Sequence, residues 1–372
     1  MQKPLETKFN NRKVLVAPLD WGLGHATRCI PVVNALINLG CTVVIACDGA
    51  QKVLLEQEFP GLQFLQLKGY DVRYSSKSSL LALKILQQVP KILSAIKYEH
   101  AWLDKVIDEH KIDMVISENR YGLHSKKIPC IFITHQLTIK ASVKWIEDLM
   151  RKKNYKYIER FTECWVPDIA GERNIAGELS HPKTLPRVPV KYIGPLSTFG
   201  KSISPGTRYK YVILLSGPEP QRTLLEEIVL RDLNGIKETC LVVRGKPADG
   251  EYPMSIAVSN VTIKNHLSRR ELNAVINTAE YVICRSGYTS VMEILLLQKK
   301  AILIPTPGQT EQEYLAEHLM QQQWCLSVDQ KNFNLSKAIE EADQFPYTSP
   351  PPFVSNPGTT IHERLSHSFA AR

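Results

Sequence analysis

The stretch that decides the fold runs from Tyr281 to Ala316 and reads YVICRSGYTSVMEILLLQKKAILIPTPGQTEQEYLA. The apolar run at 281–283 predicts a buried strand, which stops at a small-residue turn at 285–287. A helix follows, residues 301–304 form a second predicted strand, and 310–323 has a helical pattern after a Pro-Gly turn. This layout aims a helix N-terminus, with its free N–H groups, at a ligand above the sheet edge, and phosphate is the usual occupant.

Polar and small residues recur at fixed positions within this stretch, namely Arg285, Ser286, Gly287, Thr289, Glu293, Pro305, Pro307, Gln312 and Ala316. Together they resemble the nucleotide-sugar signature of glycosyltransferase family 28, whose best-known member adds N-acetylglucosamine to lipid I. The motif spans about thirty residues with several fixed positions, so it is a specific signal. The alternative is an ordinary strand-helix-strand unit with a glycine turn.

Strands and helices alternate through the rest of the chain. The predicted strands are 13–19, 41–47, 62–67, 113–117, 130–134 and 163–167, then 209–215, 240–243 and 261–263. Such alternation predicts mostly parallel sheets covered by helices on both faces, an α/β protein. Each half begins with strand, small-residue turn and helix. The sequence therefore predicts two Rossmann-like domains facing a central cleft, the GT-B architecture, with ligands at the carboxyl ends of the strands.

Composition shifts place the predicted domain boundaries. Residues 1–195 form the acceptor-side domain, and the Pro-, Gly-, Ser- and Lys-rich segment 196–208 is the linker. Residues 209–345 form the nucleotide-sugar-binding domain. By analogy with GT-B enzymes, the Pro-rich tail and closing helix of 346–372 return to the first domain.

Composition also limits the class of protein. The 372 residues suit two domains, and a hydrophobic content of 44% with 22% charged residues is typical of a globular protein. No run of 18 apolar residues predicts a membrane-spanning helix, and the start of the chain lacks a signal-peptide core. The eight cysteines form no Cys-x-x-Cys pair, which argues against a zinc site or a disulfide framework and makes the cytoplasm the expected compartment.

A net charge of +9 raises nucleic acid, an anionic membrane or an anionic substrate as partners. No nucleic-acid module is recognisable, so nucleic acid is not an expected partner. The insert 70–103 interleaves Leu80, Leu81, Leu83, Ile85, Leu86, Ile92, Leu93 and Ile96 with Lys77, Lys84, Lys91 and Lys97, and Pro90 predicts a kink. Either this amphipathic helix binds the inner face of an anionic membrane or its apolar side packs on the first sheet.

The first domain carries a glycine turn with the form Gly22-x-Gly24-His25-x-x-Arg28. Two glycines let the backbone approach a ligand closely, and the following helix supplies N–H donors. His25 is expected in the first turn of that helix, facing the cleft. Family 28 has a corresponding loop that also ends in His but holds more glycines.

Two other functions fit parts of this turn. A dinucleotide-binding dehydrogenase would need a third small residue at Thr27, although Asp48 after the second strand mimics a ribose-binding acid. The Gly-x-Gly-His-x-x-Arg form also resembles the UDP-sugar hydrolase of pseudaminic acid synthesis. A hydrolase would use the same donor site with water in place of an acceptor.

Polar residues also follow two predicted strands at 117–122 (SENRYG) and 134–136 (THQ). Both segments point to one sheet edge, where polar residues are common in sites. The candidates for the acceptor side are therefore Glu118, Asn119, Arg120 and His135 together with the glycine turn. The alternative is that Glu118 and Arg120 pair with each other and that His135 caps a helix.

The family resemblance implies an inverting transfer from a UDP-sugar to a hydroxyl acceptor, with a lipid or cell-envelope glycan as one candidate acceptor. It implies that the backbone near His266-Leu267 binds the nucleotide base, that Glu293 binds the ribose, and that Glu311 and Gln312 bind the sugar. The remaining donor-side residues hold the diphosphate or line the turns beside it, and they are Ser216, Gly217, Arg244, Arg285, Ser286, Gly287 and Thr289. His25, whose unperturbed pKa lies near neutral, is the expected general base, with Glu118 as second choice.

The sequence predicts no cofactor and no metal, because no Asp-x-Asp pair occurs. Helix dipoles and N–H groups would then stabilise the leaving diphosphate. Besides a transferase and a nucleotide-sugar hydrolase, a sensor that binds the donor without catalysis remains a third hypothesis.

Overall fold

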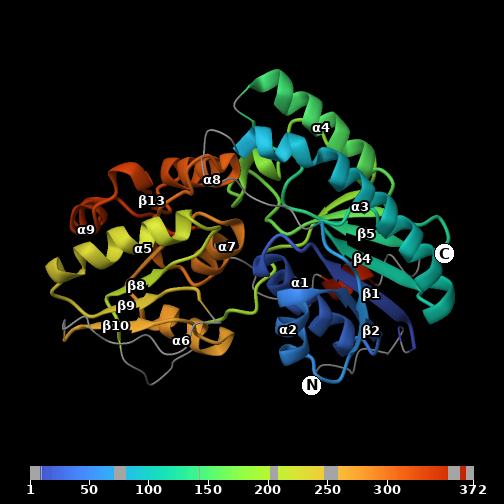
Figure 1. Ribbon diagram of the computed structural model, residues 1–372, viewed down its shortest axis with the longest axis horizontal. Helices are drawn as coiled ribbons and strands as arrows, with labels where there is room; N and C mark the ends of the chain where they lie inside the picture. Colours follow the sequence, from blue (N-terminus) through green and yellow to red (C-terminus); the bar gives the residue numbers. More distant parts are fainter. Residues whose placement is uncertain are drawn as a thin grey trace. The chain divides into compact units, whose positions relative to one another are not determined.

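The computed structural model describes residues 9, 11–70, 81–141, 143–201, 208–246, 259–350 and 361–365, with side chains from residue 88 onward in the 81–110 helix. Within these ranges the chain forms two compact units, each built on one parallel sheet (Figure 1). The first unit holds the described residues of 9–70, 83–198 and 361–365. The second holds those of 81–82 and 199–350.

The first sheet has seven parallel strands in the order β3-β2-β1-β4-β5-β6-β7. Its strands are β1 (Lys13–Pro18), β2 (Thr42–Cys47), β3 (Gln63–Gln66), β4 (Met114–Glu118), β5 (Cys130–Ile133), β6 (Glu163–Val166) and β7 (Val190–Tyr192). The central strands are continuous apolar runs because both faces of a parallel sheet are covered.

Helices cover both faces of this sheet, and they are α1 (Leu23–Asn38), α2 (Gly49–Glu58), α3 (Leu81–His110) and α4 (Lys144–Ile158), with a 3-10 turn η2 (Gly177–Leu179). Val14 packs in one core with α1, Leu55 of α2, and Leu365. Leu15, one residue further along β1, packs in the core that holds Leu103 of α3 and Ile158 of α4. Successive strand residues point to opposite faces, so this alternation places α1 and α2 on one side and α3 and α4 on the other.

The predicted amphipathic insert is the front half of α3, which continues through Pro90. Its apolar residues up to Leu86 lie outside the described side chains. Further along, Ile96 is buried beside Leu19 and Tyr70, with Ile92 partly buried against them. The described part of the apolar face therefore packs on residues of the first unit that follow its strands, and the membrane role of the rest stays a prediction. Within the described residues no helix is both long and apolar enough to cross a membrane.

The second sheet has six parallel strands in the order β10-β9-β8-β11-β12-β13. Its strands are β8 (Tyr211–Leu214), β9 (Cys240–Val243), β10 (Val261–Lys264), β11 (Tyr281–Cys284), β12 (Lys300–Leu303) and β13 (Leu326–Ser327). Its helices are α5 (Gln221–Asp232), α6 (Arg269–Thr278), α7 (Tyr288–Leu296), α8 (Thr310–Gln321) and α9 (Leu335–Gln344), with 3-10 turns η3 (Leu233–Gly235) and η4 (Gln330–Asn332). On one face, α5 and α9 pack against Tyr211 and Ile213.

The α/β prediction with two Rossmann-like parallel sheets is confirmed. Two edge strands, β7 and β13, were not predicted, because they are only three and two residues long and carry no readable alternation. The first helix begins at Leu23, so Gly24 and His25 lie in its first turn.

Candidate active site

The turn between β1 and α1 depends on a glycine. Gly22 is the residue before the helix and has φ 112° and ψ 161°, a conformation that side chains other than glycine avoid. Gln51 of α2 holds this turn from below, because its amide donates to the carbonyl of Leu19 and, at 3.2 Å, to that of Gly22. His25 therefore lies in the first turn of α1, with 16% of its side chain exposed.

Glu118 ends β4, the strand beside β1, and it lies in register with Pro18 just before the turn. This register brings a carboxylate to the start of α1. One oxygen lies 2.7 Å from His25 Nδ1. The other accepts hydrogen bonds from Arg28 Nε at 3.0 Å and Nη2 at 2.6 Å, and from Asn119 at 3.1 Å.

Glu118 is ionised at neutral pH although its side chain is only 1% exposed. Burial raises the pKa of the carboxyl, but the charges of Arg28 and His25 and their hydrogen bonds lower it further, to about 2. Arg28 Nη2 also lies 2.8 Å from His25 Nδ1. That nitrogen cannot both donate to Glu118 and accept from Arg28. The carboxylate is the stronger partner, so we assign the proton to Nδ1, which leaves the lone pair on Nε2.

Arg120 is held by α3 and also donates to the carbonyl of Pro18, at the end of β1, at 3.1 Å. Its Nε donates to Glu99 of α3 at 2.7 Å, and both side chains are 1% exposed. Glu99 also accepts from the Tyr70 hydroxyl at 2.8 Å and from the Gly122 backbone at 2.9 Å. The alternative prediction that Arg120 pairs with Glu118 is therefore wrong. These bonds fasten the loop after β4 onto α3.

His135 follows β5 and is 5% exposed. The next helix, α4, has Val143 as its N-terminal cap, so the alternative prediction that His135 caps a helix is also wrong. Among the acceptor-side candidates, the structure brings together Gly22, Gly24, His25, Arg28, Glu118 and Asn119.

In the second unit, three turns share the carboxyl edge of the sheet because β11 pairs in parallel with both β8 and β12. The first holds Ser216 and Gly217, which are exposed, and Gly217 has φ 107°. The second is 285–287, where Gly287 precedes α7 and no side chain caps the helix. The third is 305–308. The start of α7 therefore offers backbone N–H groups at this edge.

Arg285 is a buried cation that clamps these turns. Its guanidinium donates to the carbonyls of Ile304 at 3.2 Å, Pro305 at 3.3 Å and Gln221 at 2.7 Å. Burial lowers its pKa to about 10, and no carboxylate among the described residues forms an ion pair with it. The residue is 1% exposed, so its positive charge is buried at the second sheet edge without a carboxylate counterion from the described part of the chain.

Two polar atoms, one of them from the Arg285 guanidinium, lie close to Gly217. A Cβ at Gly217 would lie 3.6 Å from Thr306 Oγ1 and 3.8 Å from Arg285 Nε. Both atoms are buried without a hydrogen-bond partner among the described residues. Sequence reasoning missed Thr306, whose only signal was a polar residue between two prolines directly after a strand.

Gln312 links two of the turns from α8. Its backbone carbonyl accepts from Ser286 Oγ at 2.8 Å, and its side-chain oxygen accepts from the Thr306 backbone at 2.9 Å. Glu293 lies on α7 and is 9% exposed, with Arg269 Nη2 3.6 Å from its carboxylate. Thr289 and Glu311 lie near the starts of α7 and α8.

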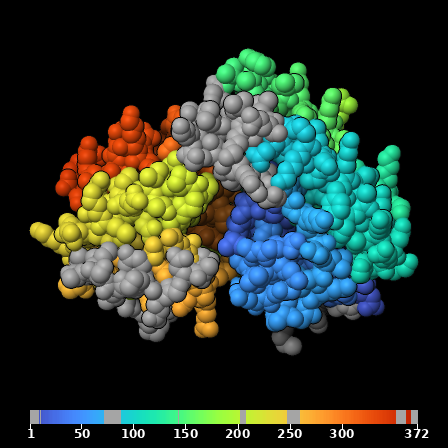
Figure 2. Space-filling model, viewed as in Figure 1, coloured from blue at the N-terminus to red at the C-terminus, as the bar shows by residue number. Residues whose placement is uncertain are grey.

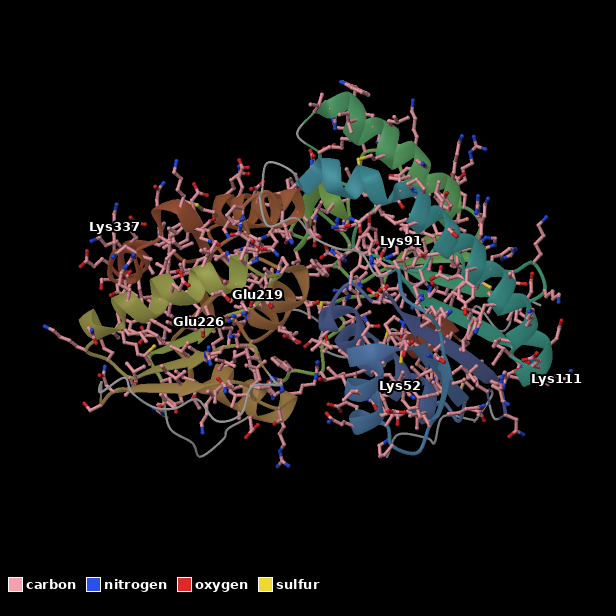
Figure 3. The ribbon with its side chains drawn as sticks, viewed as in Figure 1. Lys52, Lys91, Lys111, Glu219, Glu226 and Lys337 are labelled. Atoms are coloured by element: carbon pink, nitrogen blue, oxygen red, sulfur yellow. The ribbon has the colours of Figure 1, made fainter. Side chains whose placement is uncertain are left out.

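Arg244 follows β9 and is held by protein groups. It donates to Glu226 of α5 and, at 2.8 Å, to Asn265 in the loop after β10. Figure 3 labels Glu226 together with Glu219, and Arg222 pairs with both carboxylates. Arg244 therefore fixes the loop that carries His266 and Leu267, which lies just before α6 and its Ser268 capping box. In the described ranges, no group of three or more His, Cys, Asp or Glu side chains is placed to hold a metal ion.

Comparisons with known proteins agree with this geometry. Residues 226–351 match the glycosyltransferase family 28 C-terminal domain. An uncharacterized glycosyltransferase of Methanosarcina acetivorans is 24% identical over 325 residues, covering 81% of each chain. Among solved structures, the chain superposes on Acinetobacter baumannii MurG with a TM-score of 0.55 at 14% identity, covering 95% of each chain. For the spinosyn rhamnosyltransferase SpnG complexed with thymidine diphosphate, the values are 0.60 and 13%, covering 97% of this chain and 96% of that one.

The fold is thus that of the GT-B class, with two Rossmann-like domains. Residues 226–351 of the chain carry the C-terminal domain of glycosyltransferase family 28.

Proposed function

We propose that the protein moves a sugar from a UDP-sugar to a hydroxyl acceptor with inversion at the anomeric carbon. The observation that carries the proposal is the 2.7 Å contact between His25 Nδ1 and the ionised Glu118. This contact leaves His25 Nε2 as a base with its lone pair available. Glu118 orients the ring and stabilises the imidazolium that forms. It acts through His25 and is not itself the proton acceptor.

The bond changes follow from this arrangement. His25 Nε2 takes the proton of the acceptor hydroxyl while its oxygen attacks the anomeric carbon. The bond from that carbon to the diphosphate oxygen breaks on the opposite face, and UDP leaves with the electron pair. Attack opposite the leaving group inverts the configuration.

The donor would bind at the carboxyl edge of the second sheet. The buried charge of Arg285, the hydroxyl of Thr306 and the first N–H groups of α7 are fixed before the reaction, and they would stabilise the diphosphate as it departs. Ser216, Gly217 and Ser286 line the same edge. Glu293 would accept hydrogen bonds from the ribose hydroxyls, and the backbone at His266 and Leu267 would bind the nucleotide base. Glu311 and Gln312 would bind the sugar. Because these groups supply the charge, the proposed transfer requires no metal ion.

A nucleotide-sugar hydrolase is the second candidate, because Arg28 completes the Gly-x-Gly-His-x-x-Arg form and binds Glu118 directly. In that case water takes the place of the acceptor hydroxyl at His25 Nε2, and the donor site is unchanged.

The test is to incubate the protein with UDP-, dTDP- and GDP-sugars and to follow nucleotide release with and without sugar, polyprenyl-phosphate-sugar and small alcohol acceptors. A transferase releases UDP faster with an acceptor and forms a product of inverted anomeric configuration by NMR. A hydrolase releases UDP at one rate throughout and incorporates ¹⁸O from water into the free sugar. Binding of UDP without turnover of any donor would refute both.

A further inference from the structure

An exposed tryptophan lies in the turn that carries the proposed base. Trp21 stands between β1 and α1 and is 39% exposed. Figure 2 shows the segment of α1 and α2 (blue) at the surface of the first unit. The indole contacts the buried ring of Tyr70, with 6.3 Å between the ring centroids and an angle of 85° between the planes. A perpendicular contact covers at most one face of the indole, so flat apolar surface of Trp21 stays open to solvent.

The backbone on both sides of Trp21 is fixed. Before it, the Asp20 carboxylate accepts a hydrogen bond from the backbone of Tyr70 at 2.9 Å. After it, the Gly22 carbonyl accepts a hydrogen bond from the Gln51 amide at 3.2 Å. The indole is therefore attached to a rigid turn. A rigid aromatic side chain with two rotatable bonds loses little conformational entropy when it binds a ligand.

His25 lies close to Trp21 along the same turn. Its backbone N–H donates to the carbonyl of Gly22 at 3.4 Å, which closes a turn directly after Trp21. The two ends of such a turn lie within about 7 Å of each other, and consecutive Cα atoms are about 3.8 Å apart. The Cα atoms of Trp21 and His25 are therefore at most roughly 11 Å apart. That spacing suits one ring-sized group bound between the two side chains.

We propose that the indole of Trp21 binds the apolar face of a ring that carries the acceptor hydroxyl. The inference rests on the proposed function, because it names the class of acceptor that His25 would deprotonate. Ligand sites combine apolar and aromatic surface with a few polar groups that fix orientation, and this turn offers a flat indole and an imidazole held by Glu118. The C–H face of a pyranose and the plane of an aromatic alcohol share the required chemistry. An acyclic alcohol has no flat face and is therefore a poor acceptor.

The experiment measures acceptor kinetics of the full chain with methyl pyranosides, naphthol and hexanol, at a saturating concentration of the UDP-sugar that the protein turns over. Wild type should prefer one or both ring compounds to hexanol, and the preferred compound identifies the source of the ring. Trp21→Ala should raise KM for that compound by about 10–30-fold, the effect of losing a central aromatic contact, with kcat within about threefold of wild type. Trp21→Phe keeps a flat ring and should stay within about threefold of wild type in KM. Trp21→Leu keeps apolar volume without a flat ring and should behave like Trp21→Ala.

Two further measurements separate ring binding from general effects and from turnover. Trp145→Ala removes another exposed tryptophan of the first unit, on α4, and should leave KM for the ring compounds unchanged. Saturation-transfer NMR of the ring compounds with the UDP-bound protein reports contact whether or not sugar is transferred. A signal that is present in wild type and lost in Trp21→Ala, without transfer to any acceptor, would refute the proposed function and support the ring site. Transfer to ring acceptors with the same KM in every Trp21 variant would refute the ring site and support the proposed function.

Three other results would overturn the inference. The first is that wild type neither binds a ring compound nor prefers one to hexanol as acceptor. The second is that Trp21→Ala weakens UDP binding as much as it weakens binding of the ring compound, which would assign the indole to the donor. The third is an equal loss of kcat with unchanged KM in Trp21→Ala and Trp21→Phe, which would mean that Trp21 only holds the His25 turn in place.

Discussion

At the scale of single residues, the side chains of His25, Arg28 and Glu118 form one hydrogen-bonded group in the first unit. Glu118 holds His25 by Nδ1, and Arg28 keeps Glu118 ionised. We expect His25→Ala to lower turnover by roughly 10²–10⁴-fold, the usual range for a general base, with nucleotide affinity nearly unchanged. His110→Ala, at a histidine ending α3, is the control. If turnover survives while donor binding collapses, His25 contacts the phosphates and is not the base.

Glu118 also makes the free energy of unfolding depend on pH. Its carboxyl pKa falls from 4.5 to about 2 in the folded protein, so its ionised form contributes roughly 3 kcal/mol to the free energy of unfolding above about pH 4.5. That contribution is lost as the pH falls from about 4.5 to 2. Wild type should therefore lose more stability than Glu118→Gln over this window, as measured by chemical unfolding at successive pH values. Parallel curves for the two proteins would contradict the shift.

Glu293 gives the matching prediction for the donor. Hydrogen bonds from ribose hydroxyls to a carboxylate are worth roughly 1.5–3 kcal/mol each at most. Glu293→Ala should weaken UDP binding at least about tenfold by calorimetry, and Glu317→Ala, at an exposed glutamate of α8, should not. Unchanged affinity in Glu293→Ala would remove the residue from the donor site.

At the scale of elements, the loop after β4 is pressed directly onto α3. A Cβ at Gly122 would lie 2.3 Å from the carbonyl oxygen of Ile96 and 2.5 Å from the Cβ of Glu99, and the backbone cannot yield cheaply. Gly122→Ala should cost about 1–3 kcal/mol in the free energy of unfolding and displace Glu118, so turnover should fall as well. Gly61→Ala, where nothing lies within 4 Å, is the control in thermal unfolding. Equal melting temperatures would show that the loop can move away from α3.

At the scale of the whole molecule, the chain leaves the first unit near residue 198, and residues 361–365 belong to that unit again. Ile361 and Leu365 are both 0% exposed and lie in the core around α1. Leu365→Ala should cost about 2–5 kcal/mol in unfolding free energy. Differential scanning calorimetry tests this prediction: Leu365→Ala should melt at a lower temperature than wild type. The increase in melting temperature that UDP causes should persist in the variant. Val53→Ala is the surface control, and an equal effect in both variants would contradict the packing.

The local pattern of apolar and polar residues predicted much of the secondary structure of this protein. The apolar runs of β9 and β11 and the helix of α8 could be read directly, because burial on both faces leaves a short continuous apolar segment in the sequence. The turn residues after β8, β11 and β12 were predicted to share one edge, since parallel strands place their carboxyl ends together. The fold class follows from these signals alone, whereas the assignment of this edge to a nucleotide-sugar donor came from the family resemblance and stays a prediction.

Only the tertiary structure decided which side chains touch. The sequence offered His25 and Glu118 as rival bases, whereas the adjacency of β1 and β4 makes them partners 93 residues apart. The sequence predicted Arg120 as a site residue, whereas in the structure Arg120 forms an ion pair with Glu99 of α3. Arg285 was predicted as a donor-side residue, but its burial and its three carbonyl partners were not, and the hydroxyl of Thr306, which has no hydrogen-bond partner among the described residues, was missed. The physical reason is that periodicity records burial and local conformation, while hydrogen-bond partners depend on strand order and on helices that arrive from distant parts of the chain.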